Sequence, residues 1–374
     1  QKGLVRGTRL GQFFHVCLLE EMLTALGYAD LGYPRAMAKG LSVIGPVSES
    51  NVWKKDPDLE RCANQITEAE FLAGAWEFRA KLAATFRLDD HSVEIYKNTI
   101  KERDMKFCEG PFLDEAAVVE HLRLSGIRDP WRWLPLRRFG VPQKGSIRGV
   151  DDAAENLANA TSSRTEKLQT SSVDALVAMI RAWISQNDPE LARGIASGFE
   201  LGAWAMDEFK AYRQIPVEPD QRRMSVVAVV NPNRNPSTDE DEPRLEFFVM
   251  NGHCFGFTNA VYNYNRRPLA LNEVLLRTFK VPTDFYYDDR WGIEPLNSIP
   301  SAFKTVEEVM FMAGIRVQSE KSQGAPTIMV ADEKGDTKSI PNENCDQKKP
   351  WKDPELLGVP FDLGRLQVKV KPGR

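Results

Sequence analysis

Residues 283–295, TDFYYDDRWGIEP, place the adjacent carboxylates of Asp288 and Asp289 between two runs of strand-forming residues. Aromatic and β-branched residues favour strands, so the stretch predicts a strand, a tight turn that carries the two aspartates, and a second strand. Neighbouring carboxylates repel each other, and their charge must be dispersed by solvent or by a bound cation. The stretch therefore predicts either a solvated turn or a cation-binding hairpin.

The composition is that of an ordinary globular protein. The chain has 374 residues, of which 42% are hydrophobic and 27% charged, enough for two or three packed units. Its five cysteines and four histidines lack the spacing of a disulfide framework or a zinc site. No apolar run approaches the length that spans a bilayer. We therefore expect an intracellular protein, in the cytoplasm or nucleus, with no membrane partner.

Basic residues gather in two segments, although the net charge of the chain is −4. Residues 131–148 contain four arginines and one lysine, and residues 365–374 contain two of each, with no acid in either segment. A nucleic-acid-binding face needs only its own basic stripe. A solvated basic loop explains either segment equally well when it is taken alone.

Hydrophobic periodicity predicts different structure in the two halves of the chain. Residues 1–90 are typical of helices, with Thr67 and Glu70 spaced as a capping box. Residues 91–150 are typical of irregular structure around one short helix, and residues 173–184 of a helix with one apolar face.

From residue 196 the pattern predicts a strand, a hairpin, a long helix, the strand–turn–strand above, a helix ending at Gly314, and a short strand. Residues 332–355 are typical of a polar surface loop, and a final hairpin follows. This order predicts an α+β fold in which an antiparallel sheet carries helices on one face.

Four other stretches accompany the aspartate pair. They are DEFKAYRQIPV (207–217), CFGFTNAV (254–261), AGIRVQSEKS (313–322) and ELLGVPFDLG (355–364). In this order around YYDD, they resemble the palm of reverse transcriptases of the retroviral and retrotransposon type. YYDD alone is a weak signal, whereas several ordered motifs at compatible spacing are specific.

The resemblance covers about residues 100–374 and does not extend to residues 1–90. EGPF (109–112) and QKGSIRGVDD (143–152) resemble, more weakly, the fingers of the same polymerases. The resemblance implies a right-hand polymerase fold. Four regions follow from it: a helical N-terminal region of unknown role (1–90), a fingers-like region (91–195), a palm (196–330), and a loop insertion with a primer-grip-like hairpin that starts a thumb or connection (331–374).

The resemblance implies an RNA-directed DNA polymerase that uses two Mg²⁺ ions, with Mn²⁺ as a substitute. Such ions lower the pKa of the attacking 3′ hydroxyl and stabilise the attacking and leaving oxygens. Mg²⁺ prefers hard oxygen ligands, and the family pattern assigns this role to Asp207, Asp288 and Asp289. Lys321 matches the lysine that serves as general acid for pyrophosphate.

The resemblance also implies partners: an RNA or DNA template with its primer, and deoxynucleoside triphosphates. The residues that match its nucleotide pocket are Lys144, Arg148, Tyr212, Gln214, Phe255 and Gly256, and those that match primer or template contacts are Tyr286, Leu357 and Gly358. Tyr212 occupies the aromatic position that clashes with a 2′ hydroxyl. Because the chain begins at Gln1, we also expect it to be joined to other domains of a longer polyprotein.

The chain departs from the family pattern at three positions. Cys254, Val261 and Gly149 stand where the family has proline. No metal-binding aspartate is lost, so we expect an active enzyme. Two alternatives stay open: a catalytically decayed or domesticated polymerase that binds nucleic acid as a scaffold, and an unrelated enzyme in which YYDD is a solvated turn.

Overall fold

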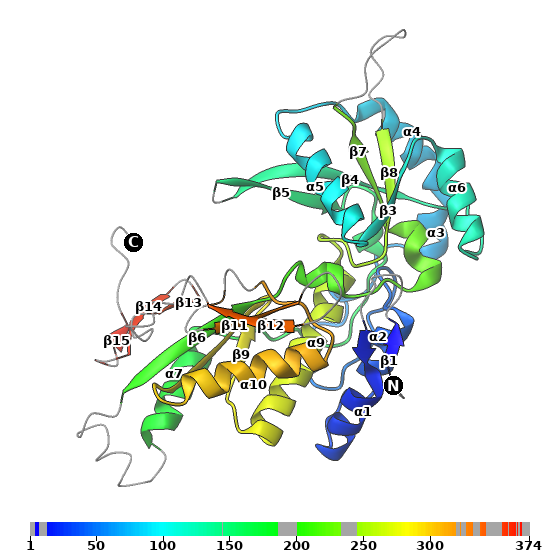
Figure 1. The fold of residues 1–374 in the computed structure, drawn as a ribbon. Helices are drawn as coiled ribbons and strands as arrows, with labels where there is room; N and C mark the ends of the chain where they lie inside the picture. The colour runs from blue at the N-terminus through cyan, green and yellow to red at the C-terminus, as the bar shows by residue number, and fades with distance from the viewer. Residues whose placement is uncertain are drawn as a thin grey trace. The chain divides into compact units, whose positions relative to one another are not determined.

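A computed structural model gives the fold of the chain (Figure 1). It describes residues 4–6, 13–143, 145–185, 200–232, 245–318, 322, 327–331, 337–341, 354–357, 359–363, 365 and 367–368. Helices and mostly antiparallel strands make this an α+β protein, as predicted. Within these residues, no helix combines the length and apolar character needed to cross a membrane.

The residues form two compact units, each assembled from segments that are distant in sequence. Unit 1 comprises Gln1–Cys17, Ala29–Leu168 and Tyr212–Arg266, and unit 2 comprises Leu18–Tyr28, Gln169–Ala211 and Arg267–Arg374. The predicted palm region, 196–330, is therefore shared between the units. Its second and third strands pair with strands from the fingers-like region and not with the strand that ends at Asp207.

Unit 1 contains a five-stranded sheet with the order β3-β8-β7-β4-β5. The strands are β3 (Cys108–Phe112), β4 (Pro135–Gln143), β5 (Ser146–Asp152), β7 (Val226–Val230) and β8 (Leu245–Met250). The sheet is mixed because β4 and β7 run parallel, so the prediction of a purely antiparallel sheet is wrong here. All five residues of β7 are buried apolar residues, which suits a strand covered on both faces.

Helices cover both faces of this sheet, and not one face as predicted. Val227 and Val229 of β7 pack in a core with Ile95 of α5, while Val226 and Ala228 pack in a second core that includes residues of α4 and α6. The helical elements of unit 1 are α2 (Tyr33–Lys39), α3 (Glu68–Ala73), α4 (Ala75–Thr85), α5 (Ser92–Asp104), α6 (Glu115–Leu124), and the 3₁₀ helices η1 (Ala158–Thr161) and η3 (Pro219–Met224). The short strands β1 (Leu4–Arg6) and β2 (Phe13–His15) pair with each other.

The one short helix expected within 91–150 is confirmed as α6, but the expectation of irregular structure around it is wrong, because α5, β3, β4 and most of β5 fill this region. Prolines and arginines hide the strand pattern in the sequence, because β4 itself contains Pro135, Pro142 and two arginines. The capping box is confirmed. The hydroxyl of Thr67 accepts a hydrogen bond from the Glu70 N–H, and the Glu70 carboxylate accepts one from the Thr67 N–H at 2.7 Å.

Unit 2 is built on a three-stranded antiparallel sheet with the order β6-β10-β9. Its strands are β6 (Leu201–Asp207), β9 (Asp284–Tyr286) and β10 (Asp289–Pro295), and its helices include α1 (Val16–Ala25), α7 (Val173–Ser185) and α10 (Ile299–Met312), as well as most of α9 (Thr258–Phe279). Leu176 of α7 packs against Ala203, Trp291 and Ile293 of the sheet. Trp204, from the same sheet, contacts Phe303 of α10 edge to face at 5.9 Å.

The C-terminal part of unit 2 contains the short strands β11 (Thr327–Ala331), β12 (Thr337–Pro341), β13 (Glu355–Leu356), β14 (Val359–Asp362) and β15 (Gln367–Val368). The final hairpin is therefore present as predicted. Strand β12 lies inside the region predicted as a surface loop, so that prediction is wrong there. The strand predicted after Gly314 is reduced to one isolated bridge, between Glu208 and Val317.

Glu294 of β10 provides a test of the packing in unit 2. Its side chain is buried, and one carboxylate oxygen accepts a hydrogen bond from the Ser298 hydroxyl at 3.1 Å. Burial raises the pKa of Glu294 from 4.5 to about 7. The unfolded chain therefore loses this proton first, and the stability that neutral Glu294 contributes is present below about pH 4.5 and lost as the pH rises through 7.

We predict that Glu294→Gln, which cannot ionise, gains stability over the wild type as the pH rises. The difference between their free energies of unfolding should move by up to about 3 kcal/mol between pH 4.5 and pH 8 in favour of the variant. Urea denaturation at the two pH values measures it. Glu308→Gln, at an exposed position of α10, controls for the loss of a charge. A pH-independent difference would contradict the burial of Glu294.

Candidate active site

The structure places Asp207 directly opposite Asp289, as register partners of the antiparallel strands β6 and β10. Opposite residues point to the same face of a sheet, with their Cβ atoms about 5 Å apart. Asp288 is next to them in the turn, and its carbonyl oxygen accepts a hydrogen bond from the Glu208 N–H at 3.0 Å. The hairpin thus places Asp207 and Asp289 opposite each other at one end of β10, with Asp288 next to Asp289 in the chain.

The turn between β9 and β10 consists of Tyr287 and Asp288, because Tyr286 pairs with Asp289. Tyr287 has a φ of 53°, in the left-handed region. The common two-residue hairpin turns need positive φ at the first turn position and normally place glycine, asparagine or aspartate there. A tyrosine in this conformation stores about 1–2 kcal/mol of strain, and such strain is concentrated at functional sites.

The carboxylates suit a Mg²⁺ ion that takes only part of its ligands from the protein. Asp207 is buried, Asp288 is half-buried and Asp289 is exposed, so the pair across the strands has one side open to solvent. Among the described residues, no three His, Cys, Asp or Glu side chains gather closely enough to hold a metal ion by themselves. Mg²⁺ commonly takes one or two carboxylates and completes its shell with water and substrate phosphates. The donor set therefore fits Mg²⁺ together with a phosphate ligand.

Two charged residues that the sequence did not single out fix the strands beneath the aspartates. Glu208, which follows Asp207, forms a buried ion pair with Arg267 of α9. Arg290, which follows Asp289, is also buried; it donates hydrogen bonds to the Thr283 hydroxyl at 2.9 Å and to the Pro268 carbonyl oxygen at 3.3 Å. Successive strand residues alternate between faces, so a charged residue directly after each site aspartate was the available signal.

In unit 1 the structure brings together three of the residues predicted to contact the nucleotide. The guanidinium of Arg148, on β5, lies 4.0 Å from the ring centroid of Phe255. Tyr212, in the 3₁₀ helix η2 (Ala211–Gln214), meets Phe255 edge to face at 5.2 Å and stacks on Tyr264 at 4.9 Å. We call Arg148, Tyr212, Phe255 and Tyr264 the aromatic–arginine cluster. It places the exposed guanidinium of Arg148 over the outermost ring of an aromatic group.

The remaining predicted residues are more dispersed. Gln214 is fully buried in unit 1. Tyr286 is exposed on β9 and contacts the ring of Tyr287 edge to face at 4.9 Å, and Leu357 lies in the turn between β13 and β14 with a φ of 54°. The three positions Lys144, Lys321 and Gly358 lie outside the described residues.

Gly256 is required by its backbone surroundings. Its φ is 127°, and a Cβ atom at this position would lie 2.1 Å from the carbonyl oxygen of Asp151. The carbonyl of Gly256 accepts a hydrogen bond from the Asn159 side chain at 2.9 Å. The close backbone approach that this glycine allows is therefore to the chain's own strand β5.

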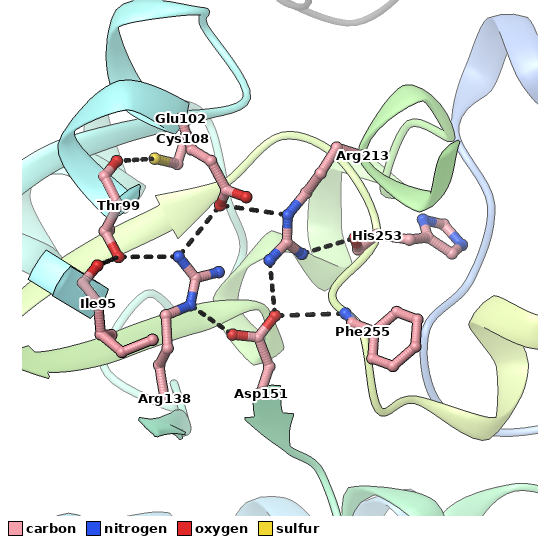
Figure 2. Close-up of polar contacts among 9 residues, drawn as sticks. All are labelled: Ile95, Thr99, Glu102, Cys108, Arg138, Asp151, Arg213, His253 and Phe255. Atoms are coloured by element: carbon pink, nitrogen blue, oxygen red, sulfur yellow. Dashed lines mark hydrogen bonds and ion pairs between the residues drawn. The ribbon is translucent and has the colours of Figure 1, made fainter. Parts of the chain in front are cut away.

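Figure 2 shows a buried charge quartet that sequence reasoning missed: Glu102, Arg138, Asp151 and Arg213. Arg138 donates to Asp151 at 2.6 Å and to Glu102 at 3.1 Å. Arg213 donates to Asp151 at 2.9 Å and lies 3.2 Å from the Glu102 carboxylate. Two positive and two negative groups thus alternate in a closed, charge-balanced ring.

Electrostatics in the quartet favour the ionised states of Arg138, Asp151 and Arg213. Burial alone would raise the pKa of Asp151, but the guanidinium groups of Arg138 and Arg213 hold it below its usual value. Nearby, burial lowers the pKa of His253 to about 3, so this histidine is neutral. Its carbonyl oxygen accepts a hydrogen bond from Arg213 at 2.8 Å.

We predict that Gly256→Ala destabilises the protein by about 2 kcal/mol or more, because the new methyl group meets backbone that cannot move freely. Gly126→Ala is the matched control. Gly126 also has a positive φ, of 76°, but a Cβ atom there meets nothing within 4 Å, so its cost should be about 1 kcal/mol. Urea denaturation of both variants measures the difference. Equal losses would contradict the close packing of Gly256 on β5.

Comparisons with known proteins add a weak structural likeness. No protein-family model matches the chain, and no curated protein sequence matches it. Among solved structures, the fold is similar to the crystal structure of the prototype foamy virus protease–reverse transcriptase, with a TM-score of 0.38 and 14% identity. The match covers 65% of this chain and 26% of the foamy virus chain. At this score the likeness assigns no family, and the site residues must carry the functional interpretation.

Proposed function

We propose that the chain is the polymerase region of a reverse transcriptase from a retroelement. It would extend a primer by RNA-directed DNA synthesis, with RNA or DNA as template. The observation that carries the proposal is the facing of Asp207 and Asp289 across β6 and β10, with Asp288 in the adjoining turn. Asp207 and Asp289 are 82 positions apart in the chain and meet in the fold, whereas the residues of a coincidental motif need not meet.

The proposed reaction is an in-line displacement at phosphorus. The 3′ oxygen of the primer attacks the α-phosphorus of a deoxynucleoside triphosphate, and the bond to pyrophosphate breaks. Asp207, Asp288 and Asp289 would bind two Mg²⁺ ions, or Mn²⁺ in their place, which would stabilise charge on the attacking and leaving oxygens. Lys321 would give a proton to the pyrophosphate.

The aromatic–arginine cluster supports a role for unit 1 in nucleotide selection. Arg148, with Lys144, would neutralise the triphosphate charge, and the ring of Phe255 holds the Arg148 guanidinium in place. Tyr212 would reject a 2′ hydroxyl. Gln214 and Gly256 would line the same nucleotide site, and Tyr286, Leu357 and Gly358 would contact primer or template.

The proposal extends to the setting in which the enzyme works. A template with its primer and a supply of deoxynucleotides places the reaction inside a cell, in the cytoplasm or nucleus. We also propose that the chain is one part of a longer polyprotein.

We predict that Asp207→Asn and Asp288→Asn each reduce primer extension on an RNA template by at least about 100-fold, because an amide cannot replace a carboxylate ligand of Mg²⁺. Removal of Mg²⁺ by EDTA should abolish the activity, and added Mg²⁺ or Mn²⁺ should restore it. Gel analysis of a labelled primer measures both effects.

The matched control for the aspartates is Asp284→Asn, in the same hairpin. One carboxylate oxygen accepts a hydrogen bond from the Ser171 hydroxyl and the other from the Phe285 N–H. An asparagine can accept from the Phe285 N–H through Oδ1 and donate to the Ser171 oxygen through its amide group. This variant should extend the primer like the wild type. Full activity of Asp288→Asn would overturn the assigned site. Template binding without nucleotide incorporation by the wild type would instead identify a decayed polymerase that acts as a scaffold.

We predict that Tyr212→Val weakens the preference for deoxynucleotides over ribonucleotides by about 10-fold to 100-fold, because the ring no longer occupies the space of a 2′ hydroxyl. Tyr212→Phe keeps the ring that stacks on Tyr264 and should keep the preference. Single-nucleotide incorporation with dTTP and UTP measures the ratio. An unchanged ratio in Tyr212→Val would show that Tyr212 only packs against its neighbours.

A further inference from the structure

We infer that Asp151 and Arg213 are positioning residues that hold the aromatic–arginine cluster in its nucleotide-selecting geometry. This inference rests on the proposed polymerase function, because it deepens the role of the same site. Neither residue contacts the nucleotide in this scheme. Each acts by fixing the backbone from which Arg148, Tyr212 and Phe255 project.

Asp151 connects three segments of unit 1 through its side chain (Figure 2). One carboxylate oxygen accepts from Arg138 of β4 at 2.6 Å. The other accepts from Arg213 at 2.9 Å and from the Phe255 N–H at 3.3 Å. The Asp151 N–H in turn donates to the Phe255 carbonyl oxygen at 3.1 Å. Both backbone polar groups of Phe255, its N–H and its carbonyl, are therefore hydrogen-bonded to Asp151.

Arg213 fixes the neighbouring turn in the same way. It lies between Tyr212 and Gln214 in the 3₁₀ helix η2. Its guanidinium reaches Asp151, Glu102 at 3.2 Å and the His253 carbonyl oxygen at 2.8 Å. Because a guanidinium is planar, several hydrogen-bond partners fix the orientation of the arginine side chain as well as neutralising its charge. The backbone of Tyr212 therefore has little freedom to turn its ring.

Two glycines allow the backbone of the loop 252–256 to approach Arg213 and Asp151 closely. A Cβ atom on Gly252 would lie 1.9 Å from the Arg213 carbonyl oxygen, and one on Gly256 would lie 2.1 Å from the Asp151 carbonyl oxygen. Phe255 lies between them on the chain and carries the Arg148 guanidinium over its ring. Movement of Asp151 or Arg213 would thus shift Arg148 and Tyr212 together.

Energetics favour a positioning role over a purely stabilising one. The side chains of all four quartet members are at least nine-tenths buried, and burying charges costs roughly as much as their attraction returns. Apolar residues of similar volume would stabilise this core at least as well. What the quartet adds is direction, because each guanidinium and carboxylate accepts only a narrow range of geometries.

The test measures nucleotide binding without turnover. A primer–template whose primer ends in a dideoxynucleotide is titrated with dTTP or UTP in the presence of Mg²⁺, and calorimetry gives both dissociation constants. In Asp151→Asn we expect the dissociation constant for dTTP to rise at least 10-fold and the dTTP/UTP preference to narrow. Arg213→Lys, which keeps the charge but not the fork, should behave in the same way and serves if Asp151→Asn does not fold.

Glu155→Gln is the matched control. Glu155 accepts two hydrogen bonds from Arg137, the neighbour of Arg138 on β4, at 2.7 and 2.9 Å. Arg137 also contacts Thr85 and Phe86 at the end of α4, whereas Arg138 contacts Thr99 and Glu102 of α5. This variant therefore loses a comparable ion pair away from the cluster and should bind dTTP within 2-fold of the wild type. Circular dichroism establishes that each variant is folded at the assay temperature.

The outcomes separate this inference from the polymerase proposal. Selective dTTP binding that is lost in Asp151→Asn and kept in Glu155→Gln supports the inference, even if the wild type extends no primer. Wild-type primer extension with unchanged selectivity in Asp151→Asn and Arg213→Lys overturns the inference alone. A wild type that neither binds dTTP nor extends the primer overturns both.

Discussion

The antiparallel pairing of β6 with β10 is the constraint on which the candidate site depends. It places Asp207 opposite Asp289, although like charges in such a position repel and weaken the sheet by up to about 1 kcal/mol. The chain offsets this through the residues that follow each aspartate, because Glu208 and Arg290 are both held by partners beneath the sheet. A bound cation would turn the same repulsion into a binding site.

Charge is handled differently in the two units. In unit 2 the carboxylates lie at the end of a sheet, with Asp289 exposed, so their charge can be met by ions and phosphate. In unit 1 the quartet is buried and its charges balance one another, and its proposed role is to orient its neighbours. The partly exposed aspartates of unit 2 suit the proposed catalytic role, and the buried quartet of unit 1 suits the proposed role in substrate selection.

Short-range sequence patterns predicted the elements whose conformation depends on residues close by in the chain. The hairpin at 283–295, the capping box of Thr67 and Glu70, and the long helix over 258–279 all follow from short-range pattern. The region 91–150 was misjudged, because its strands contain prolines and arginines whose roles depend on distant partners. Asp151 and Arg213 were missed for the same reason, since 62 positions separate them in the chain.

The sequence by itself determined the order of the motifs and the turn that carries Asp288. Only the tertiary structure decided that β7 pairs parallel with β4, that the predicted palm region is shared between two units, and that four buried charges form one ring. The physical reason is that a turn or a helix end is fixed by neighbours within a few residues. Strand partners and buried ion pairs are instead selected by the packing of the whole core, which no single segment encodes.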